Sequence, residues 1–216
     1  MTDSPAENYD RAAFAAEFDV PRGTLDKLSL YAELLAEWQQ KMNLVGPSTL
    51  PHIWNRHFRD SAQLLTLLPP PAHKRIWLDI GAGGGFPGLV IAALGGGIVH
   101  QVESIGKKAK FLEAATAAMG LEKVNFVHNQ RVESLAAFPC DVITARACAP
   151  LERLFDWGLR FAAKSTIWLL PKGESVESEL EEARRRFDFR ERRVPSRSDP
   201  RGRIVVAEAV RRKTRM

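Results

Sequence analysis

The chain has 216 residues, of which 45% are hydrophobic and 26% charged, and this usage argues against an intrinsically disordered chain. Its two cysteines cannot form a disulfide framework or a four-thiolate zinc site. No apolar run reaches the length of a membrane span and the polar, acidic start is not a secretory signal, so we expect a soluble, cytoplasmic protein.

The net charge of +5 is unevenly distributed along the chain. Residues 184–216 contain 13 Lys/Arg and 4 Asp/Glu, a balance of +9, whereas the remainder holds 18 basic and 22 acidic residues, a balance of −4. A concentrated basic tract is typical of proteins that bind RNA or DNA. A solvated basic tail explains the same charge equally well.

The N-terminal part is predicted to be helical and without strands. Its first ten residues are expected to form a leader. Leu28, Tyr31 and Leu35 then begin an apolar series at helical spacing. A second helix is predicted to start near Pro51 and to stop at the three prolines of 69–71. We therefore predict a helical N-terminal cap over residues 1–70.

From residue 75 onward, short apolar strands alternate with helical segments. The expected strands are 75–80, 98–103, 124–128, 141–145 and 166–170, and a terminal hairpin ends in a strand near 203–210. This alternation predicts an α/β fold with a mostly parallel, Rossmann-like sheet and right-handed crossovers. The terminal hairpin adds an antiparallel strand. We assign residues 71–216 to this second domain.

A glycine-rich turn follows the first predicted strand, in the segment DIGAGGGFPG. Gly81, Gly83 and Gly85 can adopt positive φ and let a ligand approach the bare backbone. The helix that follows presents unpaired N–H groups. Gly83, Gly85 and Gly88 also match the dinucleotide fingerprint G-x-G-x-x-G, whereas a P-loop is excluded because no Gly-Lys-Ser/Thr follows.

Two carboxylates flank this turn. Asp79 ends the first strand, where it would repel a pyrophosphate but would suit the ammonium group of S-adenosyl-L-methionine. Glu103 ends the second strand, where its carboxylate can accept hydrogen bonds from both ribose hydroxyls. An NAD enzyme also places an acidic residue there. Glu103 therefore indicates that a nucleoside binds, but it does not distinguish S-adenosyl-L-methionine from NAD.

The segment after the fourth strand, TARACAP, indicates the reaction. It lacks the Asp/Asn-Pro-Pro-aromatic run of enzymes that methylate exocyclic amines, and neither Cys140 nor Cys148 is placed as an activated nucleophile. Guanine N7 has a free lone pair and no proton to lose, so its methylation depends on positioning more than on a base. Arg146 could bind guanine O6, a phosphate or the cofactor carboxylate.

Four segments carry a family resemblance: NLVGPSTLPHIWNRHFRDS, LDIGAGGGFPGLVIA, NQRVES and ITARACAPL. Together they resemble the small-subunit rRNA guanine-N7 methyltransferase family (RsmG, formerly GidB). The resemblance extends from about Leu30 to Lys172. The glycine turn together with the upstream Arg56-His57 to Asp60-Ser61 motif is far more specific than either alone.

The resemblance implies a helical cap on a seven-stranded class I methyltransferase fold that uses S-adenosyl-L-methionine. The implied substrate is a guanosine in the decoding-region (530) loop of 16S rRNA, offered as RNA or as a small ribosomal subunit and methylated at N7. By matching motifs, Gly81 and Phe86 would line the cofactor site and Val132 and Glu133 would border the adenine. Arg146 would line the pocket.

Other residues and readings stay open. His57 and Asp60 share one helical face, and a structural role is favoured for His57, with Arg56 and Arg59 as weaker RNA-contact candidates. No His/Cys/Asp/Glu cluster has the spacing of a metal site, and a monomer is expected.

Three alternative functions stay open: a small-molecule methyltransferase on the same fold, an NAD-dependent oxidoreductase, and a non-catalytic RNA-binding protein.

Overall fold

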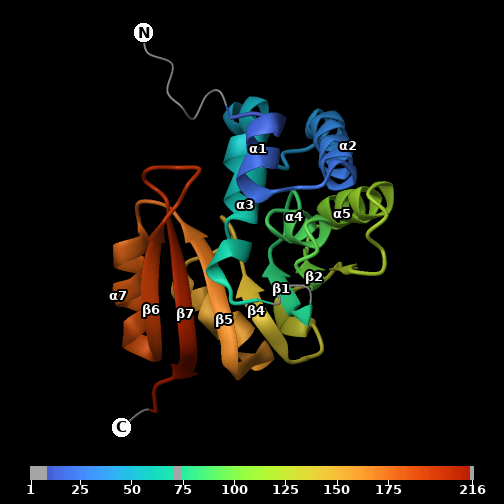
Figure 1. Ribbon diagram of the computed structural model, residues 1–216. Coiled ribbons are helices and arrows are strands. Elements are labelled where there is room, and N and C mark those ends of the chain that lie inside the picture. Colours follow the sequence, from blue (N-terminus) through green and yellow to red (C-terminus); the bar gives the residue numbers. More distant parts are fainter. Residues whose placement is uncertain (1–8, 71–73, 215–216) are drawn as a thin grey trace.

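The computed structural model describes residues 9–70 and 74–214, so most of the predicted leader lies outside the described residues (Figure 1). Within them, seven strands form one sheet in the order β3-β2-β1-β4-β5-β7-β6. The strands are β1 (Ile76–Ile80), β2 (Ile98–Val102), β3 (Asn125–His128), β4 (Cys140–Thr144), β5 (Ala162–Lys172), β6 (Phe187–Pro195) and β7 (Arg203–Arg212).

The sheet is parallel from β3 through β5, and β7 pairs antiparallel with both β5 and β6. The predicted α/β fold with a mostly parallel, seven-stranded sheet is therefore confirmed. The chain reverses its direction of winding between β1 and β4, which lie side by side. Ligands of such sheets bind outside the carboxyl ends of the strands at this reversal, so the topology alone locates the site.

Helices cover both faces of the sheet (Figure 1). One face carries α4 (Gly88–Ala93) and α5 (Gly106–Ala118), and the other carries α6 (Leu151–Gly158) and α7 (Val176–Arg186). The N-terminal helices α1 (Arg11–Phe18) and α2 (Arg22–Gln39) pack on the α4–α5 side. Short turns η5 (Val132–Ser134) and η6 (Leu159–Phe161) complete the second half.

The helix predicted from Pro51 is present in a distorted form. The chain passes through η1 (Pro47–His52), the π-helix η2 (Trp54–Arg59), the short α3 (Asp60–Ala62) and η3 (Leu65–Leu67). A π-helical turn accommodates an extra residue and is frequent at functional sites. This turn holds Arg56 and His57, and Asp60 follows it directly.

The N-terminal region shares one hydrophobic core with the sheet. Tyr31 of α2 packs against Phe58 of η2, Phe86 of the glycine turn and Phe111 of α5, at ring-centroid distances of 5.7, 5.2 and 6.2 Å. All four rings are buried. Aromatic contacts of this kind each add roughly 0.5–1.5 kcal/mol beyond area burial, so the helices are held directly against the functional face.

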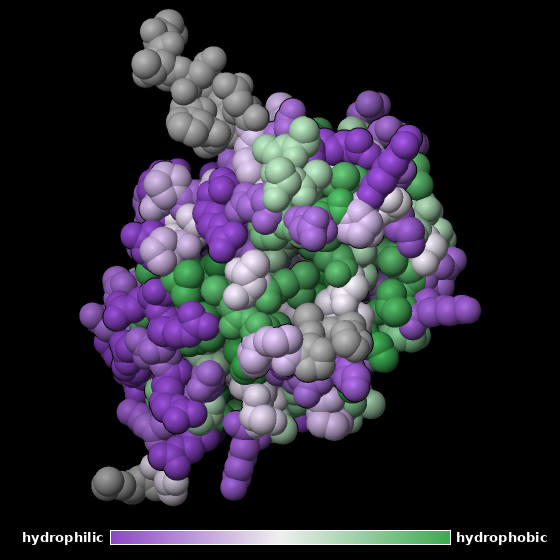
Figure 2. All heavy atoms as spheres, viewed as in Figure 1, coloured by the Kyte–Doolittle hydropathy of each residue, from purple (hydrophilic) through white to green (hydrophobic). Residues whose placement is uncertain are grey.

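The basic tract near the C-terminus is largely paired within the protein. Figure 2 shows hydrophilic side chains gathered over the side of the molecule formed by α7 and β6. Ion pairs there join Arg184 to Glu191, Arg193 to Glu177 and Arg211 to Asp188. Exposed pairs stabilise little, but they reduce the charge available to an external polyanion. None of the described helices has the length and apolar character to cross a membrane.

Candidate functional site

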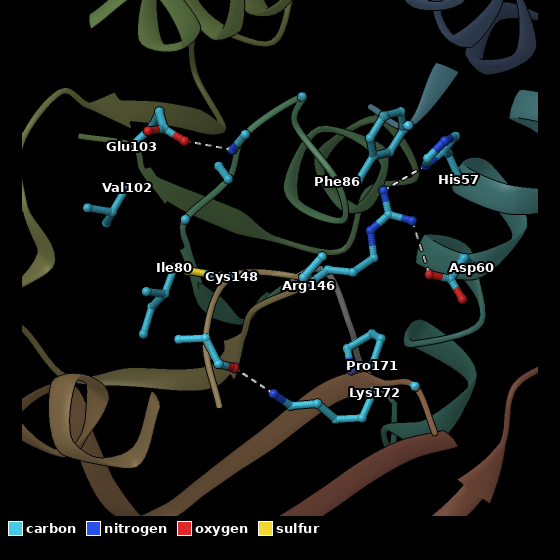
Figure 3. A pocket seen from close by; sticks show the side chains of 18 of the residues that line it. His57, Asp60, Ile80, Phe86, Val102, Glu103, Arg146, Cys148, Pro171 and Lys172 are labelled. Carbon is cyan, nitrogen blue, oxygen red and sulfur yellow. Dashed lines mark hydrogen bonds and ion pairs between the residues drawn. The ribbon is translucent and has the colours of Figure 1, made fainter. Parts of the chain in front are cut away.

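A cavity of about 960 Å³ opens at the carboxyl ends of the parallel strands (Figure 3). Its walls come from the glycine turn after β1 and from the segments that follow β2, β3, β4 and β5. Residues of the η1–α3 region and of the loop between β6 and β7 close the remaining side. The sequence-predicted site residues Gly81, Gly83, Phe86 and Glu103 all line this cavity. Val132, Glu133 and Arg146 line it as well.

The glycine turn is held open by its own conformation and by α2. Gly81, Gly83 and Gly85 have φ values of 70°, 55° and 92°, where a side chain is disfavoured. A Cβ atom on Gly81 would also lie 2.2 Å from the Sγ atom of Cys148. The hydroxyl of the buried Tyr31 donates a hydrogen bond to the carbonyl of Gly84. The bare backbone of the turn is therefore fixed beside the cavity.

Glu103 lies at the edge of the cavity with only 6% of its surface exposed. Its Oε2 accepts a hydrogen bond from the Gly83 N–H at 2.9 Å, and its Oε1 accepts one from the Ile105 N–H at 2.7 Å. Each carboxylate oxygen retains a further lone pair. Glu103 can thus brace the turn and still accept hydrogen bonds from a ligand's hydroxyls.

An apolar surface adjoins Glu103. Ile105 lines the cavity and is 52% exposed, although it is a large aliphatic side chain. Val132 of η5 is buried at the same end and Glu133 is exposed beside it. A flat aromatic base can pack on such side chains, while Glu103 binds the sugar. The bare turn, the carboxylate and the apolar wall together fit a nucleoside cofactor such as S-adenosyl-L-methionine.

Asp79 is not at the cavity surface. It is fully buried, and its Oδ2 accepts hydrogen bonds from the Gly88 N–H at the start of α4, at 3.0 Å, and from Gln101 at 3.3 Å. Its Oδ1 has no hydrogen-bond partner among the described residues. Burial raises the pKa of this carboxyl to about 6. A cationic ligand group would satisfy the unpaired Oδ1. Because Asp79 does not reach the cavity surface, the contact with an ammonium group stays a prediction, and it would require the glycine turn to move.

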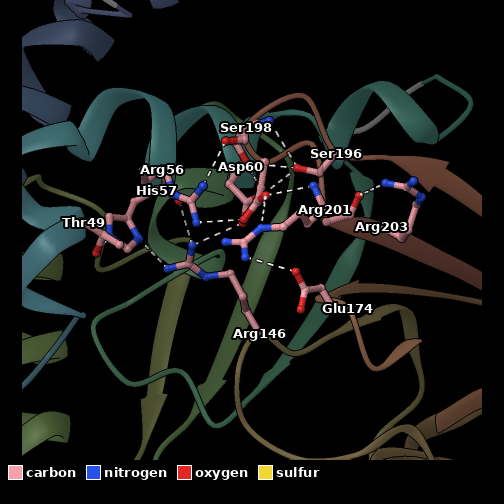
Figure 4. A network of polar contacts seen from close by, with 12 residues as sticks. Thr49, Arg56, His57, Asp60, Arg146, Glu174, Ser196, Ser198, Arg201 and Arg203 are labelled. Carbon is pink, nitrogen blue, oxygen red and sulfur yellow. Dashed lines mark hydrogen bonds and ion pairs between the residues drawn. The ribbon is translucent and has the colours of Figure 1, made fainter. Parts of the chain in front are cut away.

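Arg146 follows β4 and is held on several sides (Figure 4). Its Nη1 donates to the Arg56 carbonyl at 3.1 Å and to Asp60 Oδ2 at 3.2 Å, and its Nη2 donates to His57 Nδ1 at 2.7 Å. The guanidinium lies 5.0 Å from the centroid of the Phe86 ring. The structure therefore brings Arg146 together with His57, for which the sequence analysis favoured a structural role, and with Asp60, for which it assigned none.

The network extends into the loop between β6 and β7. Asp60 Oδ1 accepts hydrogen bonds from Ser198 at 2.6 Å and from Ser196 at 3.3 Å. Arg56, a predicted RNA-contact candidate, pairs with Asp199 at 3.0 Å. The sequence analysis missed these loop residues. Serines in a polar loop have no distinctive spacing, and only the fold brings them to Asp60.

Arg59, the other weak RNA-contact candidate, points away from the cavity. Its Nε donates to Glu17 of α1 at 2.8 Å, and its Nη1 donates to the carbonyl of Arg197 at 2.7 Å. Its guanidinium also lies over the ring of Tyr9. Arg59 thus joins the first helix to the last hairpin, and its placement supports a structural role.

Cys148 lines the cavity, but its chemistry is not that of a nucleophile. Burial, with smaller contributions from the charges of Asp79 and Glu103, raises the pKa of its thiol. The thiol form therefore predominates at neutral pH, and the reactive thiolate is disfavoured. Cys140 is buried, and burial raises the pKa of its thiol to about 12. These pKa shifts argue against a nucleophilic role for either cysteine. Cys140 is buried, as expected of a packing residue, whereas Cys148 is exposed at the cavity.

Comparison with known proteins agrees with this geometry. Residues 24–202 match the family model GidB, described as rRNA small subunit methyltransferase G. The chain is 46% identical to ribosomal RNA small subunit methyltransferase G of Rhodospirillum rubrum, over 89% of this chain and 94% of that protein. It is 44% identical to the protein of the same name from Hyphomonas neptunium, over 96% and 99% of the two chains.

Solved structures share the fold at low sequence identity. A SAM-dependent methyltransferase from Aquifex aeolicus superposes with a TM-score of 0.57 and 15% identity, over 82% of this chain and 97% of that one. A mutant of MtNAS in complex with S-adenosylmethionine superposes with a TM-score of 0.59 and 16% identity, over 94% and 86% of the two chains.

Proposed function

Because the chain belongs to the ribosomal RNA small subunit methyltransferase G family, we propose that it methylates N7 of a guanosine in the decoding-region loop of 16S rRNA. Family membership makes it an S-adenosyl-L-methionine-dependent rRNA methyltransferase and leaves the NAD-dependent alternative without support. The methylated atom and the RNA loop are the parts that we infer.

The protonation and hydrogen bonding of the ionisable groups near Arg146 are the observation that supports N7 as the methylated atom. Among the described residues at this end of the cavity, each potential base is already engaged or protonated. His57 Nδ1 and Asp60 Oδ2 accept from Arg146, and the raised pKa of Cys148 keeps its thiol protonated. Exocyclic amines and hydroxyls must lose a proton when they are methylated, whereas N7 of guanine has none to lose.

The bound cofactor supplies a methyl group activated by its sulfonium. N7 would accept this methyl group without giving up a proton, so no residue of the site would have to act as a base. The protein's task is therefore alignment. Glu103 and the glycine turn hold the nucleoside, and Arg146 orients the purine by donating to its O6 or to a neighbouring phosphate.

The organisation around this site is also part of the proposal. We assign residues 1–70 to a helical cap and 71–216 to the methyltransferase domain, and we propose that the protein acts as a cytoplasmic monomer. The cap carries Arg56, His57 and Asp60 to the edge of the cavity, so both parts contribute to the site.

Transfer of labelled methyl groups to unmodified 16S rRNA, with mapping of the product, tests the function. The RNA is offered naked and in assembled small subunits, with a pool of small metabolites as the control. N7-methylguanosine is recognised by strand cleavage with aniline after borohydride reduction, and we expect one such site in the decoding-region loop. Label in another atom of the RNA would refute the N7 assignment, and label only in metabolites would refute the RNA substrate.

A further inference from the structure

We propose that His57 is a positioning residue, which fixes the orientation of Arg146 by accepting a hydrogen bond from its guanidinium at Nδ1. The inference rests on the proposed function, because Arg146 is the group assigned there to the target purine. It gives a role to a buried histidine that would otherwise count as core.

The geometry around the guanidinium leaves it little freedom. The Arg56 carbonyl and Asp60 both accept from Nη1, and His57 accepts from Nη2 (Figure 4). The His57 ring stacks on Phe86 at 4.7 Å with an interplanar angle of 26°, and the guanidinium lies over the same ring. The Nε–H of Arg146 forms no hydrogen bond with any residue that the structure describes. It is therefore available to a ligand in the cavity.

The hydrogen-bond partners determine the tautomer of His57. Arginine has donors only, so Nδ1 must carry the lone pair and Nε2 must carry the proton. The Nε2–H then donates to Thr49 Oγ1 at 2.8 Å, and the Thr49 hydroxyl donates onward to the Gly46 carbonyl at 2.7 Å. Each atom along this series has one consistent role, so the ring cannot rotate without breaking two hydrogen bonds.

The charge state of the ring agrees with this role. Burial first, and then the positive charges of Arg146 and Arg56, lower the pKa of His57 to about 3. A neutral ring can accept from Arg146, whereas a protonated ring cannot. The negative charge that balances Arg146 comes from Asp60, which Ser198 and Gln63 fix at 2.6 and 3.0 Å.

Two substitutions separate the two nitrogens of the ring. His57→Asn retains an acceptor near the Nδ1 position, whereas His57→Gln retains a donor near Nε2 and removes that acceptor. We expect His57→Gln to lower kcat for rRNA methylation by about 100-fold with the cofactor Kd changed by no more than about twofold. We expect His57→Asn to recover most of kcat.

The pH profile distinguishes a positioning residue from a general base. The charged groups facing His57 are Arg146, Arg56 and Asp60. In the native enzyme we expect no loss of kcat/KM near pH 6.5 on acidification, because His57 is already neutral. A loss at that pH which His57→Asn abolishes would mean that His57 is a base, and it would overturn the proposal.

Nitrogen NMR of the native protein tests the inference even if a variant fails to fold. With ¹⁵N-labelled histidine, the ring of His57 should show a protonated Nε2 and an unprotonated Nδ1 at pH 7. The opposite tautomer, an imidazolium, or equal activities of the Asn and Gln variants would refute the role. Mapping the methylated atom is a separate measurement, so failure of the N7 assignment can be distinguished from failure of the His57 role.

Discussion

The hydroxyl of Tyr31, on α2, donates a buried hydrogen bond to the main-chain carbonyl of Gly84, in the glycine turn 53 residues further along the chain. This contact connects the N-terminal helices to the backbone that would hold the cofactor. We expect Tyr31→Phe to reduce the free energy of unfolding by about 1–2 kcal/mol, because the carbonyl loses its buried partner. The cofactor Kd should rise as well. Urea denaturation and calorimetry measure the two effects.

Tyr9→Phe is the matched control for that substitution. The Tyr9 hydroxyl donates to Glu17 at 2.6 Å, and neither residue lines the cavity. Its loss should change stability without changing cofactor affinity. Equal cofactor Kd values for the native protein and Tyr31→Phe would show that α2 does not support the turn.

Glu103→Gln should weaken cofactor binding. The substitution removes the negative charge, and its amide NH₂ group cannot accept the hydrogen bond that one of the two backbone N–H groups now donates. A charge-assisted hydrogen bond contributes about 1.5–3 kcal/mol, so the cofactor Kd should rise by about 10- to 150-fold. Calorimetry with S-adenosyl-L-methionine measures the change. Glu122→Gln, at an exposed position, serves as the control.

Gly81→Ala should abolish cofactor binding. The new Cβ would lie 2.2 Å from Cys148 Sγ, and φ at this position is 70°. In the double variant with Cys148→Gly, the steric clash is removed while the backbone strain remains. Binding should therefore return in part. If the single variant bound the cofactor normally, the close contact between these two loops could not be a feature of the working enzyme.

His57 should make the protein less stable in acid. Because its pKa is about 3 in the folded chain against an ordinary 6.5, the unfolded chain binds an extra proton between these values. Its contribution is complete above pH 6.5 and is lost as the pH falls toward 3. The loss at pH 5 amounts to about 2 kcal/mol. Denaturation at pH 7.5 and pH 5 should show a smaller acid effect in His57→Asn, and an unchanged effect would contradict the lowered pKa.

RNA binding should depend on cations at the rim of the cavity more than on the paired basic tract. Lys108, Arg131 and Arg203 line the cavity, and none forms an ion pair with an acidic residue that the structure describes. A plot of the logarithm of the RNA-binding constant against the logarithm of the salt concentration has a negative slope. Replacing any one of these residues with Gln should reduce the magnitude of that slope by about one. Arg190→Gln, which removes an arginine already paired with Glu208, should leave the slope nearly unchanged.

The strand-turn-helix around Gly81 and the position of Glu103 could be predicted, because the carboxyl ends of parallel strands meet at one edge. Asp79 was harder to place. Side chains alternate along β1, so Asp79 shares the α4-facing side with Trp77, and there it accepts from the first turn of α4. A carboxylate at the end of a strand can face either way, and only the packing of α4 decides which.

The helical region was predicted less completely than the sheet. Helix α1 has a short and weakly amphipathic sequence, RAAFAAEF, and gives no clear apolar series. The π-turn of η2 has no recognisable pattern either, although it determines where Arg56 and His57 point. Their contact with Arg146, 89 to 90 residues away, depends on tertiary structure that local sequence does not encode.

Ser196 and Ser198 complete the hydrogen bonding of Asp60 from the last hairpin of the chain. During synthesis, the glycine turn and Glu103 emerge from the ribosome well before this hairpin does. The nascent protein therefore has its cofactor-binding strands before it has the support that orders Arg146. A proteolytic nick in the loop between β6 and β7 would loosen the contacts of Ser196 and Ser198 with Asp60, and we expect it to lower methyl transfer more than cofactor binding.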